Sequence, residues 1–171
     1  MDRTTSTTIV IAVILLAFVG MAIGWRGRRK RQAFLGRPDP VPAELGRVLF
    51  TAEAFYVATT MADDELNRVA VAGLGFRARA IATVAETGVI VSLAGATEVF
   101  IPLTALRAID RATFTIDRVV ERDGLVRISW SLGDTTVDSY LRFADPANAV
   151  ALIDAVQAIL SSTVPLEGDA P

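Results

Sequence analysis

The side chains that this sequence offers for chemistry are few, because its 171 residues include no cysteine and no histidine. This inventory excludes Cys–His pairs, Ser–His–Asp triads and zinc sites built from cysteine or histidine. Carboxylates, arginines and hydroxyls remain, but no spaced pair of carboxylates suited to general acid–base catalysis stands out. We therefore expect a protein that is not an enzyme and that uses neither a metal nor a cofactor.

Three arginines are the candidates for binding an anion. Arg68, Arg77 and Arg79 follow the spacing Arg-x8-Arg-x-Arg across a loop and the strand expected after it. Their guanidinium groups could hold a phosphate through paired hydrogen bonds. The alternative is that they form the solvent-exposed face of a strand, and the acidity of the surrounding sequence favours that alternative.

Two other motifs in the same region have structural explanations. Asp63, Asp64 and Glu65 are adjacent, whereas the ligands of a calcium loop are spaced along the chain, so we interpret them as part of a solvated loop. The glycine-rich sequence GLGF, at Gly73–Phe76, precedes a strand, whereas a phosphate-binding glycine loop precedes a helix. We expect neither motif to bind a ligand.

Charge is distributed unevenly along the chain. Residues 26–37 carry six basic groups and no acidic one, while residues 38–171 carry ten basic and eighteen acidic groups, a net charge of −8. Because phosphate contacts need clustered cations, we expect no nucleic-acid partner for the acidic part. The basic arm, residues 26–37, directly follows an apolar segment, which favours anionic lipid headgroups as its partner.

The apolar segment predicts a transmembrane helix over residues 9–25, after a short tail at residues 1–8. Ten of these 17 residues are Ile, Leu, Val or Phe, and about 20 apolar residues cross a bilayer. One basic side chain precedes the segment and six follow it, which places the N-terminus outside and the rest of the chain in the cytoplasm. The alternative is a cleaved signal peptide, which would need positive charge before the apolar run and a small-residue cleavage site after it.

The end of the apolar segment predicts the residues at the membrane interface. Gly20 and Gly24 form a GxxxG pattern, which lets two membrane helices approach closely and so predicts a homodimer; the alternative is that these small residues merely fit. An aromatic residue followed by a run of cations is typical of an interfacial anchor. The expected interface residues are Trp25, Arg26, Arg28, Arg29, Lys30 and Arg31.

Prolines at positions 38, 40 and 42 predict a stiff, extended linker over residues 38–47. At about 3.1 Å per residue, the stretch from Arg37 to Ala43 would hold the following domain roughly 20 Å from the bilayer.

Alternation of apolar and polar residues predicts a domain of about seven short antiparallel strands, a sandwich or small barrel, over residues 48–161. Asp145 is a good N-cap and Pro146 a good first helical residue, so we expect one C-terminal helix with an apolar stripe that packs on the sheet. Residues 162–171 are expected to be a flexible tail. The expected strands are 54–61, 76–85, 89–93, 98–103, 106–116, 125–132 and 136–143.

Seven strands closed by a C-terminal helix resemble a pleckstrin-homology (PH) domain. The stretches FYVATT, RVAVAGLGFRA, TGVIV, IPLTALRAID, DRVVERDGLVRISW and VDSYLR resemble an actinobacterial family of single-pass membrane proteins with a cytoplasmic PH-like domain. The resemblance covers most of residues 54–142. It makes the spacing of Arg68, Arg77 and Arg79 similar to the basic pattern with which some PH domains grip phosphoinositide headgroups. The family has no defined catalytic or binding residues, so none is carried over.

The leading hypothesis for function is a membrane-anchored, non-enzymatic PH-like module that binds a cytoplasmic or membrane protein. An alternative is an accessory subunit of a transporter or envelope complex, because one span without ionisable residues cannot conduct alone. A further alternative is binding of a phosphate or lipid headgroup through the three arginines.

Overall fold

The computed structural model describes residues 3–32, 34–71, 73–112, 114–115, 118–119 and 124–162. The chain divides into two units, Met1–Phe34 and Leu35–Pro171, and each is described by itself.

The first unit is a single helix, α1, which spans Arg3–Arg31. Within it, Thr7–Gly27 has a mean hydropathy of 2.6 and is long and apolar enough to cross a membrane, a test that a signal sequence also passes. Its large apolar side chains are exposed. A helix suits such a segment because every backbone hydrogen bond is made within it. The helix continues as far as Arg31, so the first half of the basic arm, residues 26–31, is helical.

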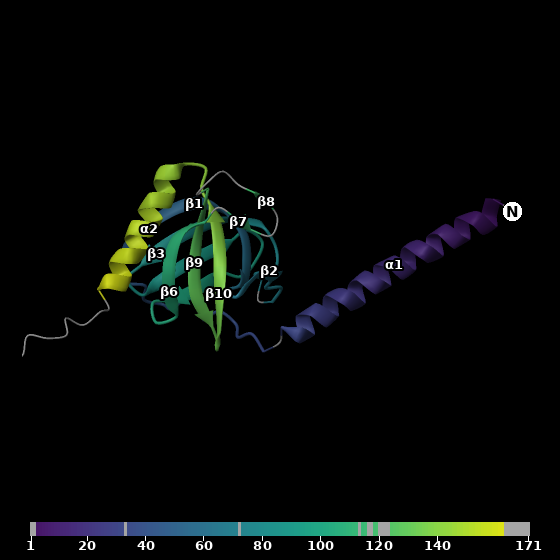
Figure 1. The fold of residues 1–171 in the computed structure, drawn as a ribbon, viewed down its shortest axis with the longest axis horizontal. Coiled ribbons are helices and arrows are strands. Elements are labelled where there is room, and N and C mark those ends of the chain that lie inside the picture. The colour runs from purple at the N-terminus through teal and green to yellow at the C-terminus, as the bar shows by residue number, and fades with distance from the viewer. Residues whose placement is uncertain are drawn as a thin grey trace, which may run out of the picture. The chain divides into compact units, whose positions relative to one another are not determined.

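The second unit is built on one antiparallel sheet with the strand order β5-β4-β3-β1-β10-β9-β6, and β2 pairs with β1 (Figure 1). The expected mainly-β fold with seven principal strands and a C-terminal helix is confirmed. The strands are Val48–Met61 (β1), Asp64–Arg68 (β2), Ala78–Ala85 (β3), Gly88–Leu93 (β4), Val99–Pro102 (β5), Leu106–Ala112 (β6), Leu125–Leu132 (β9) and Thr135–Arg142 (β10), with a separate pair, Phe114–Thr115 (β7) and Arg118–Val119 (β8).

Three strand predictions need correction. The first strand begins at Val48 and not at residue 54, because its first half pairs with β3 over Val48–Tyr56. Asp64–Arg68, expected within a loop, forms the short strand β2 against the end of β1. The strand expected over residues 106–116 ends at Ala112, and Phe114–Thr115 pairs with β8.

Strand β1 belongs to both halves of the sheet. Its first part pairs with β3, and its second part, Phe55–Met61, pairs with β10. Between them the register to β10 skips Val57, which makes a β-bulge. Bulges bend a strand and increase its twist, so the sheet folds into the two layers that α2 closes at one side (Figure 1).

Arg68 stabilises this bulge. The skipped residue Val57 has a backbone carbonyl that accepts a hydrogen bond of 3.0 Å from Nη2 of Arg68, which is partly buried. Buried carbonyls need a partner, and a charged donor makes the stronger bond. Arg68 therefore has a structural role where strand β1 changes its neighbour.

A chain of buried hydrogen bonds crosses the sheet at the same place. The indole N–H of Trp130 donates to Ser139 Oγ (2.9 Å), and the Tyr56 hydroxyl donates to the Leu74 carbonyl (2.9 Å). Thr59 Oγ1 lies 2.7 Å from both the Tyr56 and the Ser139 hydroxyls. Each hydroxyl has one proton, so only one arrangement satisfies all four bonds: Ser139 donates to Thr59, and Thr59 donates to Tyr56.

Helix α2, Pro146–Ser161, begins and packs as the sequence predicts. The Asp145 side chain accepts a hydrogen bond of 2.9 Å from the backbone N–H of Ala147, and Pro146 occupies the first turn. Just before the helix, the rings of Phe50 and Phe143 meet edge to face at 6.3 Å. The buried helical residues are Ala149, Leu152, Val156 and Ile159.

The proline-rich segment is not a free spacer. Leu35 belongs to the core of the domain with 6% of its surface exposed, and Asp39 forms a β-bridge with Phe100 of β5. Gly36 lies against Gly133 so closely that a Cβ there would meet the Gly133 nitrogen at 3.1 Å. Within the expected linker, residues 38–47, Asp39 thus pairs with the edge of the sheet, while the expected distance of about 20 Å between domain and bilayer stays a prediction.

We expect Arg68→Met to lower the free energy of unfolding by about 1.5–3 kcal/mol, because the Val57 carbonyl loses its charged donor while the apolar stem is kept. Urea unfolding of the full chain in detergent, followed by circular dichroism, measures the change. Arg79→Met, an exposed arginine in the same sheet, is the control and should change little. Equal losses for the two variants would contradict the role given to Arg68.

Tyr56 makes the free energy of unfolding depend on pH in the alkaline range. Burial raises its pKa above the ordinary value of 10.0, and the hydrogen bond with Thr59 and the charge of Arg68 oppose this only in part. The folded state holds the phenol proton more tightly than the unfolded chain, so stability is complete below pH 10 and falls as the pH rises further, by up to about 1.4 kcal/mol per pH unit.

The variant that tests this is Tyr56→Phe. We expect its free energy of unfolding at neutral pH to be lower by about 1–3 kcal/mol, because the Leu74 carbonyl and the Thr59 hydroxyl lose a partner. Above pH 10 its stability should fall less steeply than that of the wild type. Urea unfolding at a series of pH values measures both slopes, and parallel curves would show that the titration of Tyr56 is not coupled to folding.

Candidate functional site

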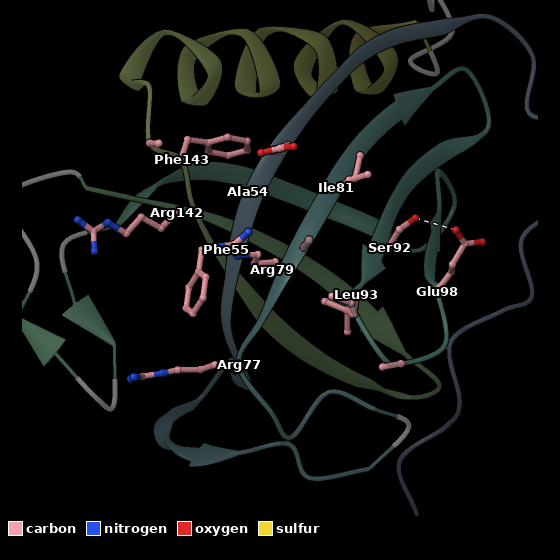
Figure 2. A pocket seen from close by; sticks show the side chains of 15 residues that line it. Ala54, Phe55, Arg77, Arg79, Ile81, Ser92, Leu93, Glu98, Arg142 and Phe143 are labelled. Carbon is pink, nitrogen blue, oxygen red and sulfur yellow. Dashed lines mark hydrogen bonds between the residues drawn. The ribbon is translucent and has the colours of Figure 1, made fainter.

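An open groove lies on the outer face of the sheet, over β10, β1, β3 and the loop after β4 (Figure 2). Its volume of about 1120 Å³ exceeds the roughly 300–1,000 Å³ typical of small-molecule pockets. Side chains that alternate outward from the strands line it. The groove residues on which the argument depends are Glu53, Phe55, Arg77, Arg79, Ile81, Ser92, Glu98 and Arg142.

One end of the groove is cationic. The register places Phe55 of β1 opposite Arg79 of β3 on one side and opposite Arg142 of β10 on the other. The two arginines are thus two strands apart, about 10 Å between their Cα atoms, and both are exposed. Figure 2 shows Arg77 and Arg142 on one side of the groove, with the ring of Phe55 between them in this view.

Two acidic side chains also line the groove. Glu53 lies opposite Ile81 on the neighbouring strand, two residues further along β1 and β3 from the row of Phe55. Glu98, before β5, accepts a hydrogen bond of 2.7 Å from the Ser92 hydroxyl, drawn as a dashed line in Figure 2. The floor of the groove is partly apolar, because Phe55 and Ile81 expose 41% and 46% of their surfaces.

Comparison with protein families identifies the domain. Residues 35–157 match the model of the family described as Bacterial PH domain-like. The chain belongs to this family. The matched region begins at Leu35, the residue at which the chain enters the core of the PH-like domain. No curated protein matches the sequence.

Several solved structures are similar to this chain at low sequence identity. A chain of the 8S snRNP assembly intermediate has 9% identity and a TM-score of 0.47, with 81% of this chain and 98% of that chain covered. Vav1 bound to an allosteric inhibitor has 10% identity and a TM-score of 0.45, with 82% of this chain and 33% of that chain covered. The activated truncation of Vav1 has 11% identity and a TM-score of 0.46, with 82% of this chain and 33% of that chain covered. Likenesses this distant carry no argument about the function of this chain.

The structure brings together two of the three arginines expected to bind an anion. Arg77 and Arg79 line the groove, whereas Arg68 does not and bonds to Val57 instead. Sequence reasoning missed Arg142, which completes the cationic end. Its signal was present at the end of β10, where Arg142 is exposed between the buried residues Leu141 and Phe143. Only the pairing of the last strand with β1 shows that Arg142 lies near Arg79.

The other motifs lie outside the groove. Asp63, Asp64 and Glu65 are exposed, and the Asp64 carboxylate accepts a bond of 3.1 Å from the Leu66 N–H. In the GLGF sequence, Gly73 has a φ of +82° and Leu74 is buried, so this turn serves to place Leu74 in the core. Across the described part of the chain, no three acidic side chains lie close enough to hold a metal ion.

The expected membrane residues all lie on α1. Trp25 and Arg26 are exposed, and the helix continues over Arg28–Arg31, whose side chains lie outside the described residues. Gly20 and Gly24 lie four residues apart on one face, and a Cβ at either would meet nothing within 4 Å. The predicted interface and dimerisation roles of these residues stay predictions.

A second cluster of charges is structural. Arg127 donates from Nε and Nη2 to both carboxylate oxygens of Asp110, at 2.9 and 2.5 Å, and its Nη1 lies 3.7 Å from Asp138. Asp138 is buried, with 3% of its side chain exposed, and also accepts a hydrogen bond from Ser129. Hydrogen bonding to Asp110, together with both negative charges, raises the pKa of Arg127 despite its partial burial.

We expect Arg127→Met to destabilise the domain by about 2 kcal/mol, because it leaves the buried Asp138 carboxylate without its cation while solvent screens the half-exposed Asp110. The double variant Arg127→Met/Asp138→Asn should recover most of this loss, since no buried charge remains. Urea unfolding of both variants measures the effect, and a double variant less stable than Arg127→Met alone would contradict it.

Proposed function

We propose that this protein is a single-pass, membrane-anchored binding module without enzymatic activity, and that its PH-like domain faces the cytoplasm and binds a protein partner in the groove. The observation that carries the proposal is the 21-residue apolar stretch of α1, which has exposed side chains and a mean hydropathy of 2.6. Exposing that surface to water would be costly, whereas a bilayer of about 30 Å accommodates it.

The charge after the apolar stretch supports the orientation. Five basic residues lie between positions 26 and 31, and Lys and Arg next to a span remain on the cytoplasmic side. The same cations favour contact with anionic headgroups, at about 1 kcal/mol each.

The inventory of side chains supports a binding role over a catalytic one. The chain has neither of the two side chains, cysteine and histidine, that most often serve as a strong nucleophile or as a base near neutral pH. The groove contributes arginines, glutamates and apolar side chains, which suits recognition of a partner. A role as accessory subunit of a transporter or envelope complex is compatible with the same anchor and stays an alternative.

The orientation can be tested without background labelling because the chain has no cysteine of its own. In intact bacterial cells, a membrane-impermeant maleimide should label Ser6→Cys before the span and should not label Asp134→Cys in the exposed turn after β9. Permeabilised cells should label both. Labelling of Asp134→Cys in intact cells would overturn the cytoplasmic location.

Two controls complete the test. Mass spectrometry of the purified protein should find residues 1–25 retained, and their loss would show that α1 is a signal sequence. Changing the flanking cations to Gln should give a mixed orientation, with partial labelling at both positions, because the charge difference across the span is removed. The changed residues are Arg26, Arg28, Arg29, Lys30 and Arg31.

A further inference from the structure

The cationic end of the groove is one row of residues on three neighbouring strands. Phe55 of β1 lies in register between Arg142 of β10 and Arg79 of β3, and all three side chains are exposed (Figure 2). Within the described part of the chain, neither arginine makes an ion pair or a side-chain hydrogen bond. Each guanidinium group has five N–H donors, so the row offers two sets of donors to a ligand.

Glu53 is the acidic neighbour of this row. It precedes Phe55 by two residues on the same face of β1, which places it diagonally beside both Arg79 and Arg142. Neither arginine lies within ion-pair distance of it. With Glu53 counted, the two arginines leave a net charge of +1, which one further carboxylate would neutralise.

The surroundings of the row discriminate between a single anionic group and an anionic surface. Residues 38–171 carry a net charge of −8, so the domain around the row repels a bilayer or polymer that carries many negative charges. The carboxylates of Glu53 and Glu98 also line the groove. A single carboxylate can reach the arginines without bringing further negative charges towards these acidic groups.

The apolar floor favours a peptide over a phosphate group. Phe55 and Ile81 are about half-exposed beside the arginines, in a groove with a volume of about 1120 Å³. Covering such side chains with apolar groups is favourable, and a phosphate group supplies none. A carboxylate has two oxygens that can accept hydrogen bonds from both arginines. A protein segment in which an acidic residue adjoins large apolar residues supplies both kinds of contact.

We propose that the groove binds an acidic segment of a partner protein, in which one aspartate or glutamate adjoins large apolar residues. The carboxylate accepts hydrogen bonds from Arg79 and Arg142, and the apolar side chains pack on Phe55 and Ile81. Glu53 limits the site to one carboxylate, because a second would be repelled. This inference rests on the proposed function, because it states the chemistry of the partner for that binding module.

The test begins with a selection from a random dodecapeptide phage library on the full chain in nanodiscs of zwitterionic lipid. The enriched peptides should share an acidic residue beside aromatic or large aliphatic ones. Measured by fluorescence polarisation, they should bind Arg79→Glu/Arg142→Glu at least about tenfold more weakly, since attraction becomes repulsion. The same peptides with the acidic residue changed to lysine should bind this double variant better than the wild type.

Glu53→Gln is the variant that should gain affinity. Removing the negative charge beside the arginines should tighten binding of the acidic peptides by about twofold to fivefold, as expected for one exposed charge at a distance of about 7 Å. Weaker binding to Glu53→Gln would contradict the position given to the carboxylate.

The matched control is Arg107→Glu, which makes the same change of charge at an exposed arginine of β6 outside the groove and should leave binding unchanged. Circular dichroism confirms that each variant is folded. Equal binding of the acidic peptides to the wild type and to Arg79→Glu/Arg142→Glu would overturn the proposal.

Two further outcomes separate this inference from the proposed function. Enriched peptides that lack an acidic residue but bind Phe55→Ser/Ile81→Ser more weakly would overturn the chemistry stated here and leave the binding module in place. Failure to enrich any peptide would count against both.

Labelled vesicles that contain anionic lipid, mixed with the full chain in zwitterionic nanodiscs, test the other class of occupant. We expect no capture of the vesicles through the groove. Capture that Arg79→Glu/Arg142→Glu abolishes, without any selected peptide, would overturn the proposal in favour of a headgroup site.

Discussion

Polar groups buried at the bend of β1 must find partners inside the protein, because water does not reach them. The bulge at Val57 frees a carbonyl, and Arg68 supplies its donor. The hydroxyls of Thr59 and Ser139 lie opposite each other on β1 and β10 and are linked in one chain of hydrogen bonds to Trp130 and to Leu74. The chain joins β9, β10, β1 and the turn that contains Leu74, so these elements keep one relative position.

The bend of β1 also positions the residues that line the groove. The pairing of β1 with β3 ends, and its pairing with β10 begins, around Phe55. The two pairings overlap at this residue, so Phe55 lies opposite both Arg79 and Arg142. The cationic end is therefore assembled from three strands at the point where the sheet folds over. The neighbouring row of the groove is set by the regular pairing of β1, β3 and β4, in which Glu53, Ile81 and Ser92 follow one another across the sheet.

Much of the fold follows from local sequence patterns. The uncharged run in α1, the Asp145–Pro146 start of α2 and the alternation along β9 each identify an element without reference to the rest of the chain. The bulge at Val57 has no sequence signal, and so the structural role of Arg68 was not predictable. The proximity of Arg142 to Arg79 depends on the pairing of the last strand with the first, which is a non-local property. The sequence predicts an extended proline-rich segment, but the pairing of Asp39 with Phe100 of β5 is a contact with a distant part of the chain and has no local signal.

Because Leu35 and Asp39 belong to the domain, the connection between α1 and the domain is short. Leu35 is already fixed in the domain, so only residues 32–34 follow the last helical residue, Arg31. A chain of that length reaches about 14 Å at most. The length of chain between the two units is therefore set by these few residues and not by the proline-rich segment, which belongs to the domain.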